Sequence, residues 1–257
     1  MLFMRNTLTL FFFVFGLQFP AEASQTFSSG LNKVPLIELY TSEGCSSCPP
    51  ADLWLSQLKN DERLWKEFVP IAFHVDYWDY IGWKDPFAKR ENSLRQRRYR
   101  QQGNIKGVYT PGLIFMGQEW RTWYYEKSIP KVEWSQAGDL SVSIDNNVVQ
   151  IQYNPVNSTA RNPAKLKAHM SILGFDLAVD IKRGENQGKI LRHEFVNLSH
   201  QKIKTTLNKS AVGKFDYHWT LNIPDQFINS KDKLGIAIWI SATDSQQPLQ
   251  STGAWLN

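Results

Sequence analysis

Cys45 and Cys48 are the residues of this sequence best suited to carry out chemistry. They are the only two cysteines in 257 residues, and only Ser46 and Ser47 separate them. A disulfide that closes so small a loop adds little stability, because the entropy that a cross-link removes from the unfolded chain grows with loop length. The spacing therefore indicates thiol–disulfide reactivity rather than a structural cross-link.

The segments on either side of the pair predict which sulfur reacts. The apolar run 34–40 is typical of a buried strand, and apolar side chains recur at helical spacing over 51–58. Pro49 and Pro50 suit the first turn of that helix, where the missing N–H groups have no intrahelical partner. Because a helix N-terminus stabilises a nearby negative charge, we expect Cys45 to be the nucleophilic thiolate. Cys48 is then expected to be the resolving thiol.

Two other side chains near the pair have two interpretations each. Glu38 lies within the predicted buried strand, where its carboxyl group either exchanges protons with Cys48 or is a hydrogen-bonded structural acid. His74 is the histidine expected nearest the site, and it is either a core residue or a metal ligand. The sequence contains no second Cys-x-x-Cys motif and no closely spaced histidine pair, so it gives no indication of structural zinc. A Cu(I) site of Cys45, Cys48 and His74 is an alternative, because a soft ion suits thiolates.

An aromatic segment follows the next predicted strand, 69–75. Parallel strands joined by a right-handed crossover end at one edge of a sheet, so this segment is expected to converge with the cysteines. Its aromatic side chains form either a lip that grips a peptide or a flap that covers the sheet. Glu43, which we expect to be exposed, joins this region. The residues that we expect to contact substrate here are Glu43, Tyr77, Trp78 and Trp83, with Tyr80 beside them.

The dipeptide Thr110-Pro111, just before the apolar run 113–116, resembles a feature of the thioredoxin superfamily. In that superfamily a cis-proline before an antiparallel strand packs against the Cys-x-x-Cys and helps to hold the substrate backbone. Pro111 matches this position, with Thr110 before it, and the alternative is an ordinary turn proline. The resemblance implies that Thr110 and Pro111 bind substrate.

Longer motifs make the resemblance more specific. The segments 39–52, 74–87 and 108–111 are similar to the signatures of a secreted bacterial family described only as a thioredoxin-like domain of unknown function, and 183–188 is similar to a later one. The likeness covers nearly all of the chain after the first 23 residues and implies redox chemistry. One difference from thioredoxin is that Ser46-Ser47 stands between the cysteines, so the direction of electron flow is left open.

The chain divides into two parts by its hydrophobic pattern. Strand-like and helix-like segments alternate up to about residue 134, whereas from about residue 139 the apolar period is two, with a hairpin turn at Asn146-Asn147. We therefore expect an α/β fold class. Residues 24–136 would form a thioredoxin-like domain with an aromatic loop insertion, and residues 137–257 an antiparallel β-sandwich domain.

The N-terminal residues predict where the protein is located, and the net charge limits the classes of partner that it can bind. Arg5, the apolar stretch 8–19 and Ala21-Glu22-Ala23 are typical of a signal peptide over residues 1–23, which predicts a periplasmic or secreted bacterial protein that is not inserted in the membrane after cleavage. The net charge of +5 is spread along the chain and indicates no nucleic-acid partner. The helix expected over 87–102 is strongly basic, which indicates either a solvated face with ion pairs or a surface for an acidic or phosphorylated partner.

Three functions from different classes fit these observations. The first is an exported thiol–disulfide oxidoreductase that needs no cofactor and acts on protein or small thiols and disulfides, with a separate partner that recycles the pair. The second is a Cu(I)-binding protein of the metallochaperone kind. The third is a non-catalytic binding module with inert thiols.

Overall fold

The computed structural model describes residues 24–126, 128–132, 135–156, 166–204, 215–225 and 234–256. The predicted signal peptide, residues 1–23, lies outside them. The described residues contain three α-helices, α1 Pro49–Gln57, α2 Arg90–Gln101 and α3 Trp123–Glu126, and two short 3-10 helices, η1 Leu58–Asn60 and η2 Asp79–Ile81. The strands are β1 Gln25–Ser28, β2 Leu36–Thr41, β3 Val69–His74, β4 Gly112–Phe115, β5 Gln118–Glu119, β6 Asp139–Asp145, β7 Val148–Asn154, β8 Leu166–Gly174, β9 Leu177–Asp180, β10 Ile190–His193, β11 Val196–Lys204, β12 Phe215–Thr220, β13 Leu234–Ala242 and β14 Pro248–Trp255.

An eight-stranded sheet runs through both parts of the chain, in the order β14-β13-β8-β11-β3-β2-β4-β5. The two parts join where β11 lies parallel to β3, with Val196 opposite Ala72. There the Ala72 amide also donates a hydrogen bond to the carbonyl oxygen of Phe195, at 2.8 Å. The free edge of β3 is thus covered by a strand from far along the sequence, which removes an edge open to aggregation.

The expected fold class, a thioredoxin-like α/β domain followed by a β-sandwich domain, is wrong. The chain has a β-rich fold with 44% strand and 16% helix. The physical reason is the pairing of β11 with β3, because through β11 it joins β8 and β13 to β3 and β2, which the hydrophobic pattern had assigned to a separate domain. Alternation of apolar residues identifies a strand but does not identify its neighbour.

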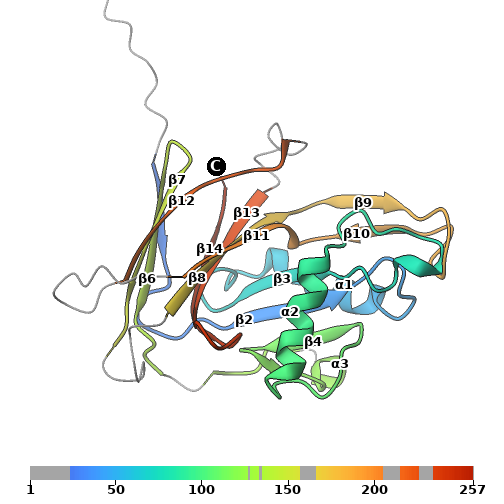
Figure 1. Ribbon diagram of the computed structural model, residues 1–257, viewed down its shortest axis with the longest axis horizontal. Helices are drawn as coiled ribbons and strands as arrows, with labels where there is room; N and C mark the ends of the chain where they lie inside the picture. The colour runs from blue at the N-terminus through green and yellow to red at the C-terminus, as the bar shows by residue number, and fades with distance from the viewer. Residues whose placement is uncertain are drawn as a thin grey trace, which may run out of the picture.

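A second sheet covers part of one face of the first. Its four strands have the order β1-β6-β7-β12, and they lie on the side of the molecule away from the helices (Figure 1). One apolar core holds inward side chains of β6, β7 and β12 together with those of β8, β11 and β13, such as Ile151, Met170 and Ile238. Strand β13 is buried on both faces, since Ala237 and Trp239 belong to the other core. That dual burial explains its continuous apolar sequence.

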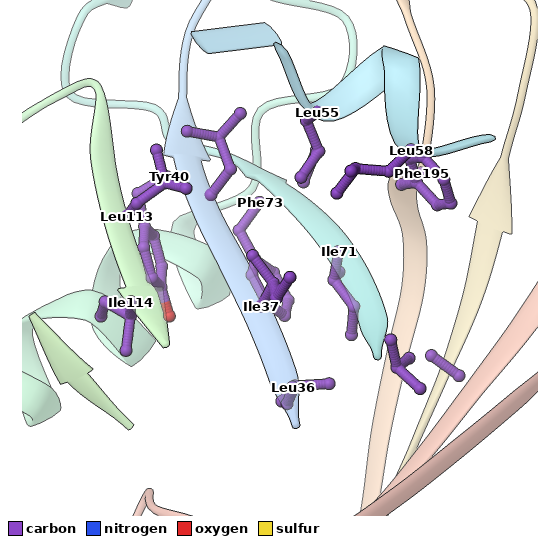
Figure 2. Close-up of a cluster of buried hydrophobic side chains, with 14 of the residues drawn as sticks. Leu36, Ile37, Tyr40, Leu55, Leu58, Ile71, Phe73, Leu113, Ile114 and Phe195 are labelled. Carbon is purple, nitrogen blue, oxygen red and sulfur yellow. The ribbon is translucent and has the colours of Figure 1, made fainter. Parts of the chain in front are cut away.

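The other core lies around β2 and β3 and positions the cysteines. Leu55 of α1 and Leu58 of η1 lie over the strands that carry Ile37 and Ile71 (Figure 2). Alternate residues of β2 reach opposite faces, because successive side chains of a strand point to opposite sides. The Thr41 hydroxyl bonds to Asp52 of α1, whereas Glu38 bonds to Arg95 of α2. The two helices therefore cover opposite faces of β2.

Several local predictions are confirmed. Helix α1 begins with Pro49 and Pro50 in its first two positions. Asn146 and Asn147 have positive φ angles of 45° and 66° and connect β6 to β7, as a tight hairpin turn requires. The basic helix is shorter than expected and ends before Gly103, whose φ of +76° suits glycine. Strands β1, β10, β11 and β14 and helix α3 were not predicted from the sequence.

Candidate functional site

Cys45 and Cys48 form a disulfide directly before α1, with their Cα atoms 5.4 Å apart. Cys48 is the N-cap residue of the helix. The prolines at the next two positions carry no N–H, and the amides of Ala51 and Asp52 donate to the carbonyl oxygen of Cys48. These N–H groups are therefore not available to a Cys45 thiolate, which would be stabilised by the helix dipole and by the Ser47 hydroxyl, whose oxygen lies 3.4 Å from the Cys45 sulfur.

Both sulfur-bearing residues are buried, since Cys45 is 1% exposed and Cys48 is 0% exposed. Much of the cover comes from a hairpin of β9, β10 and the turn 181–189 between them, which we call the capping hairpin. The buried Asn186 amide donates to the carbonyl oxygens of Glu43, at 2.8 Å, and of Cys45, at 3.0 Å. Glu185 accepts the Ser46 N–H at 3.1 Å. The pair is closed off from solvent in this conformation.

The aromatic segment after β3 lies on another side of the cysteine loop. A Cβ atom on Gly44 would meet the Cβ of Trp78 at 3.1 Å, so glycine permits this close approach. The Trp78 indole N–H donates to the Thr110 hydroxyl at 2.7 Å, and the peptide bond between Thr110 and Pro111 is cis. The structure thus brings the cysteine loop, the aromatic segment and Thr110-Pro111 together. In Figure 1 the turn of the capping hairpin reaches the same end of the molecule.

The aromatic side chains are mostly held by polar contacts. The Trp83 indole donates to Glu43 Oε2 at 2.7 Å, and the Tyr77 hydroxyl donates to Gln96 Oε1 at 3.0 Å. Burial raises the pKa of Tyr77 well above its ordinary value. Tyr80, in contrast, is 82% exposed. These contacts favour the flap interpretation for Tyr77, Trp78 and Trp83, with only Tyr80 free to act as a lip.

The expectation that Glu43 is exposed is wrong. Its side chain is buried, and both carboxylate oxygens are occupied, one by Trp83 and the other by His193 Nε2 at 3.1 Å. His193 lies in β10 of the capping hairpin, so Glu43 fastens both covering segments to the cysteine loop. The sequence could not show this, because His193 is 150 residues away in the chain.

Glu38 does not meet the cysteines in this structure. Its carboxylate lies on the α2 face of β2, where Arg95 donates to it at 2.7 and 2.9 Å. The hydroxyls of Tyr40 and Tyr99 donate to the same carboxylate. Thr41, on the opposite face, is the β2 residue that reaches α1. The placement favours the structural interpretation of Glu38.

Asp52 is a site residue that the sequence reasoning missed. It follows Cys48 by four residues on α1, which places both on one face of the helix. It is buried and accepts the Thr41 hydroxyl at 2.9 Å. Burial raises the pKa of Asp52, although the charges of His193 and His74 act in the opposite direction. The spacing of four residues on an amphipathic helix was the signal that could have identified it.

His74 forms a buried ion pair with Asp85, whose carboxylate oxygen lies 2.7 Å from His74 Nδ1. Burial would lower the pKa of His74, but the Asp85 charge outweighs it and raises that pKa. Burial would likewise raise the pKa of Asp85, yet His74 lowers it. Within the described ranges, no three His, Cys, Asp or Glu side chains lie together as a metal site would require. The copper set of Cys45, Cys48 and His74 stays a prediction.

The ion pair makes stability depend on pH in a definite direction. Because its pKa is raised, His74 contributes to the free energy of unfolding. This contribution is fully present below about pH 6.5 and is lost as the pH rises through the raised pKa. The lowered pKa of Asp85 gives stability that is present above about pH 4 and is lost as the pH falls through the lowered pKa. We expect Asp85→Asn to lower the free energy of unfolding by about 1–3 kcal/mol between these limits. The difference from wild type should shrink as the pH rises above about 6.5 and through the raised pKa of His74.

Urea unfolding of both proteins across this pH range measures the effect. Asp145→Asn, at an exposed position at the end of β6, is the matched control and should change stability by less than about 0.5 kcal/mol. A constant difference between Asp85→Asn and wild type at every pH would contradict the assignment of the ion pair.

Comparison with known proteins places this chain in a family. A family model described as "Protein of unknown function (DUF1223)" matches residues 36–241. The chain belongs to this family. The DUF1223 match includes both cysteines, Thr110-Pro111 and the capping hairpin. No curated protein matches the chain.

Two solved structures share the fold of this DUF1223 protein. A protein of Agrobacterium tumefaciens is 24% identical, with a TM-score of 0.56, and the match covers 87% of this chain and 94% of that one. HBP35 of Porphyromonas gingivalis is 11% identical, with a TM-score of 0.53, over 89% of this chain and 76% of that one. At these identities the likeness concerns the fold alone. Among the described residues of this chain, no helix has the length and apolarity needed to cross a bilayer.

Proposed function

We propose that this DUF1223 protein is an exported thiol–disulfide oxidoreductase that acts through Cys45 and Cys48. The observation that carries the proposal is that the only two cysteines of the chain are joined in a disulfide at the N-terminus of a helix. That position favours the thiolate form of a cysteine, which is the reactive form. The small loop also favours reactivity over a role as a structural cross-link.

The exchange proceeds in two balanced steps. A client thiolate attacks the Cys45 sulfur, a mixed disulfide forms, and Cys48 leaves as a thiolate. A second client thiolate then attacks the client sulfur of the mixed disulfide, and Cys45 leaves. The client loses two electrons and becomes a disulfide, while the Cys45–Cys48 pair is reduced. In the reverse direction the pair reduces a client disulfide, and a redox partner recycles the pair in either case.

We assign the proton that Cys48 takes up or releases to Asp52 in place of Glu38. Asp52 is buried one helical turn from Cys48, and burial raises its pKa, so it keeps a proton to a higher pH than an ordinary aspartate does. Asp52→Asn should therefore alter the pH profile of the exchange rate, while Glu38→Gln should leave the profile of the folded protein unchanged.

The burial of the disulfide adds a requirement to the proposal. We expect a client to reach Cys45 when the capping hairpin moves, and polar contacts of Asn186, Glu185 and His193 join the hairpin to the cysteine loop. Local opening of such a segment needs much less free energy than global unfolding.

We infer that the site, rather than the whole architecture, relates the chain to the thioredoxin superfamily, since strand, cysteine pair, helix and Thr110-Pro111 occur there in the expected order.

The test is to trap the mixed disulfide with Cys48→Ala in a bacterial host that exports the full chain. We expect disulfide-linked adducts on non-reducing gels that disappear on reduction, and none with Cys45→Ala/Cys48→Ala. A fractionation of the same cells tests the predicted periplasmic or secreted location. Absence of adducts together with tight stoichiometric Cu(I) binding would favour copper handling, and inert thiols without metal binding would favour a binding module.

A further inference from the structure

An aromatic groove lies between α1 and α3, on the helix that begins at the cysteines. Its lining includes Pro50, Leu53, Trp54, Trp123, Tyr124 and Tyr125. Leu53 is 63% exposed, Tyr124 is 59% exposed and Tyr125 is 84% exposed. Trp54 forms the base of the groove, with its ring 5.3 Å from that of Trp120 and 6.1 Å from that of Trp123. A cluster of large exposed apolar side chains of this kind is typical of a binding surface.

A basic cleft lies further along the same side of the molecule. It has a volume of about 620 Å³, and Lys33, Lys66, Lys131 and Arg63 line it together with the single carboxylate of Glu67. Arg63 is already paired with Asp61, at 2.7 Å. No carboxylate among the described residues forms an ion pair with the three lysines. Lys33 is half-buried, and burial lowers its pKa because the charged ammonium group is partly removed from water. An anion beside Lys33 would therefore stabilise its positive charge.

A third hollow connects the groove to the lysine cleft. It shares Trp54 and Gln57 with the groove, and it shares Arg63, Ile129, Pro130 and Lys131 with the cleft. Its lining also holds two carboxylates, those of Glu126 and of Asp61, which is paired with Arg63. The groove begins at Pro50, two residues after Cys48. Helix α1 has nine residues and is about 13 Å long, a distance that an extended peptide covers with about four residues. The connected surface therefore has the dimensions of a peptide site that starts beside the disulfide.

We propose that the aromatic groove and the lysine cleft together bind one extended segment of a client polypeptide. Its apolar side chains lie on Leu53, Trp54 and Tyr124, and its acidic side chains enter the cleft beside Lys33, Lys66 and Lys131. The lining of the groove contains no lysine or arginine, so the backbone phosphates of a nucleic acid would meet no cation there. This favours a polypeptide over a nucleic acid. This inference rests on the proposed function, because it takes the bound polypeptide to be a client of the cysteine pair. It adds the chemical class of that client, a segment with apolar residues followed by acidic ones.

The test measures binding to the oxidised full-length protein with a dye-labelled peptide that contains no cysteine. The probe has about four apolar residues, including tyrosine and leucine, followed by about four glutamates. A matched peptide carries glutamine at those positions. We expect Lys33→Gln and Leu53→Ser each to weaken binding of the glutamate peptide about tenfold. Lys106→Gln, an exposed lysine outside the cleft, is the charge-matched control and should leave binding unchanged.

The outcomes separate this inference from the proposed function, because the probe cannot form a disulfide. Equal binding of the two peptides, or no effect of Lys33→Gln and Leu53→Ser, overturns the inference even if Cys48→Ala traps clients. Binding that depends on these residues upholds the groove even if no client is trapped. Binding of single-stranded DNA or of phosphatidylglycerol vesicles that Lys33→Gln abolishes, with no peptide binding, also overturns it.

Discussion

Replacement of Arg95 by methionine is expected to lower the free energy of unfolding by about 3–5 kcal/mol, the largest loss we predict for a single substitution. Arg95 is 2% exposed and forms a two-point ion pair with Glu38, which is 0% exposed. Its guanidinium also lies 5.2 to 5.4 Å from the rings of Phe73, Tyr99 and Trp239. Loss of Arg95 leaves the Glu38 carboxylate buried without a counter-charge. Burial beside this carboxylate already raises the pKa values of Tyr40 and Tyr99.

Urea unfolding of the oxidised protein at neutral pH measures this loss. Arg97→Met, at an exposed position of the same helix, is the matched control and should change stability by less than about 0.5 kcal/mol. The double variant Arg95→Met/Glu38→Gln should recover part of the loss, because both charges are then gone. A loss below about 1 kcal/mol in Arg95→Met would show that the pair does not hold α2 to β2.

Asn186→Ala is expected to speed the reduction of the Cys45–Cys48 disulfide by dithiothreitol about 10- to 100-fold. The Asn186 amide makes two hydrogen bonds to backbone carbonyls of the cysteine loop. Its removal takes the Asn186 donor from the Glu43 carbonyl and leaves the Cys45 carbonyl with the Cys48 N–H, at 3.2 Å. The cost of about 1–3 kcal/mol falls on the closed state of the capping hairpin, because the open state does not make these bonds. The open fraction, and with it the reduction rate, rises accordingly.

The reduction rate is measured by alkylation of the released thiols in a buffer in which both proteins stay folded. Gln187→Ala, at the exposed neighbouring position of the same turn, should react at the wild-type rate. Amide hydrogen exchange over residues 181–189 should accelerate in Asn186→Ala and not in Gln187→Ala. An unchanged reduction rate in Asn186→Ala would mean that another segment shields the disulfide.

Local signals in the sequence were sufficient for the elements next to the cysteines. The apolar run 34–40 and the spacing over 51–58 predicted a strand and a helix on either side of the pair, and both form. Asn146-Asn147 predicted its hairpin turn, because few residues adopt a positive φ readily. Each of these features depends on residues close together in the chain.

Strand β14 shows why other elements were missed. Gln250, Ser251 and Thr252 are polar yet 0% exposed, so the strand has no apolar pattern. The Gln250 side chain accepts the Val34 amide and donates to the carbonyl oxygens of Asn32 and Gly138. The Ser251 hydroxyl donates to the Val34 carbonyl. Partners that lie more than a hundred residues away satisfy these groups, so no local pattern could reveal that the strand is buried.

The candidate site divides in the same way. The sequence by itself determined the cysteine pair, the helix that follows it and the aromatic segment that comes near it. The tertiary structure alone decided that Glu43 is buried, that Arg95 of a basic helix pairs with Glu38, and that the capping hairpin closes over the disulfide. The physical reason is that burial and charge pairing arise from contacts between segments distant in the chain, whereas helix and turn preferences arise from neighbouring residues.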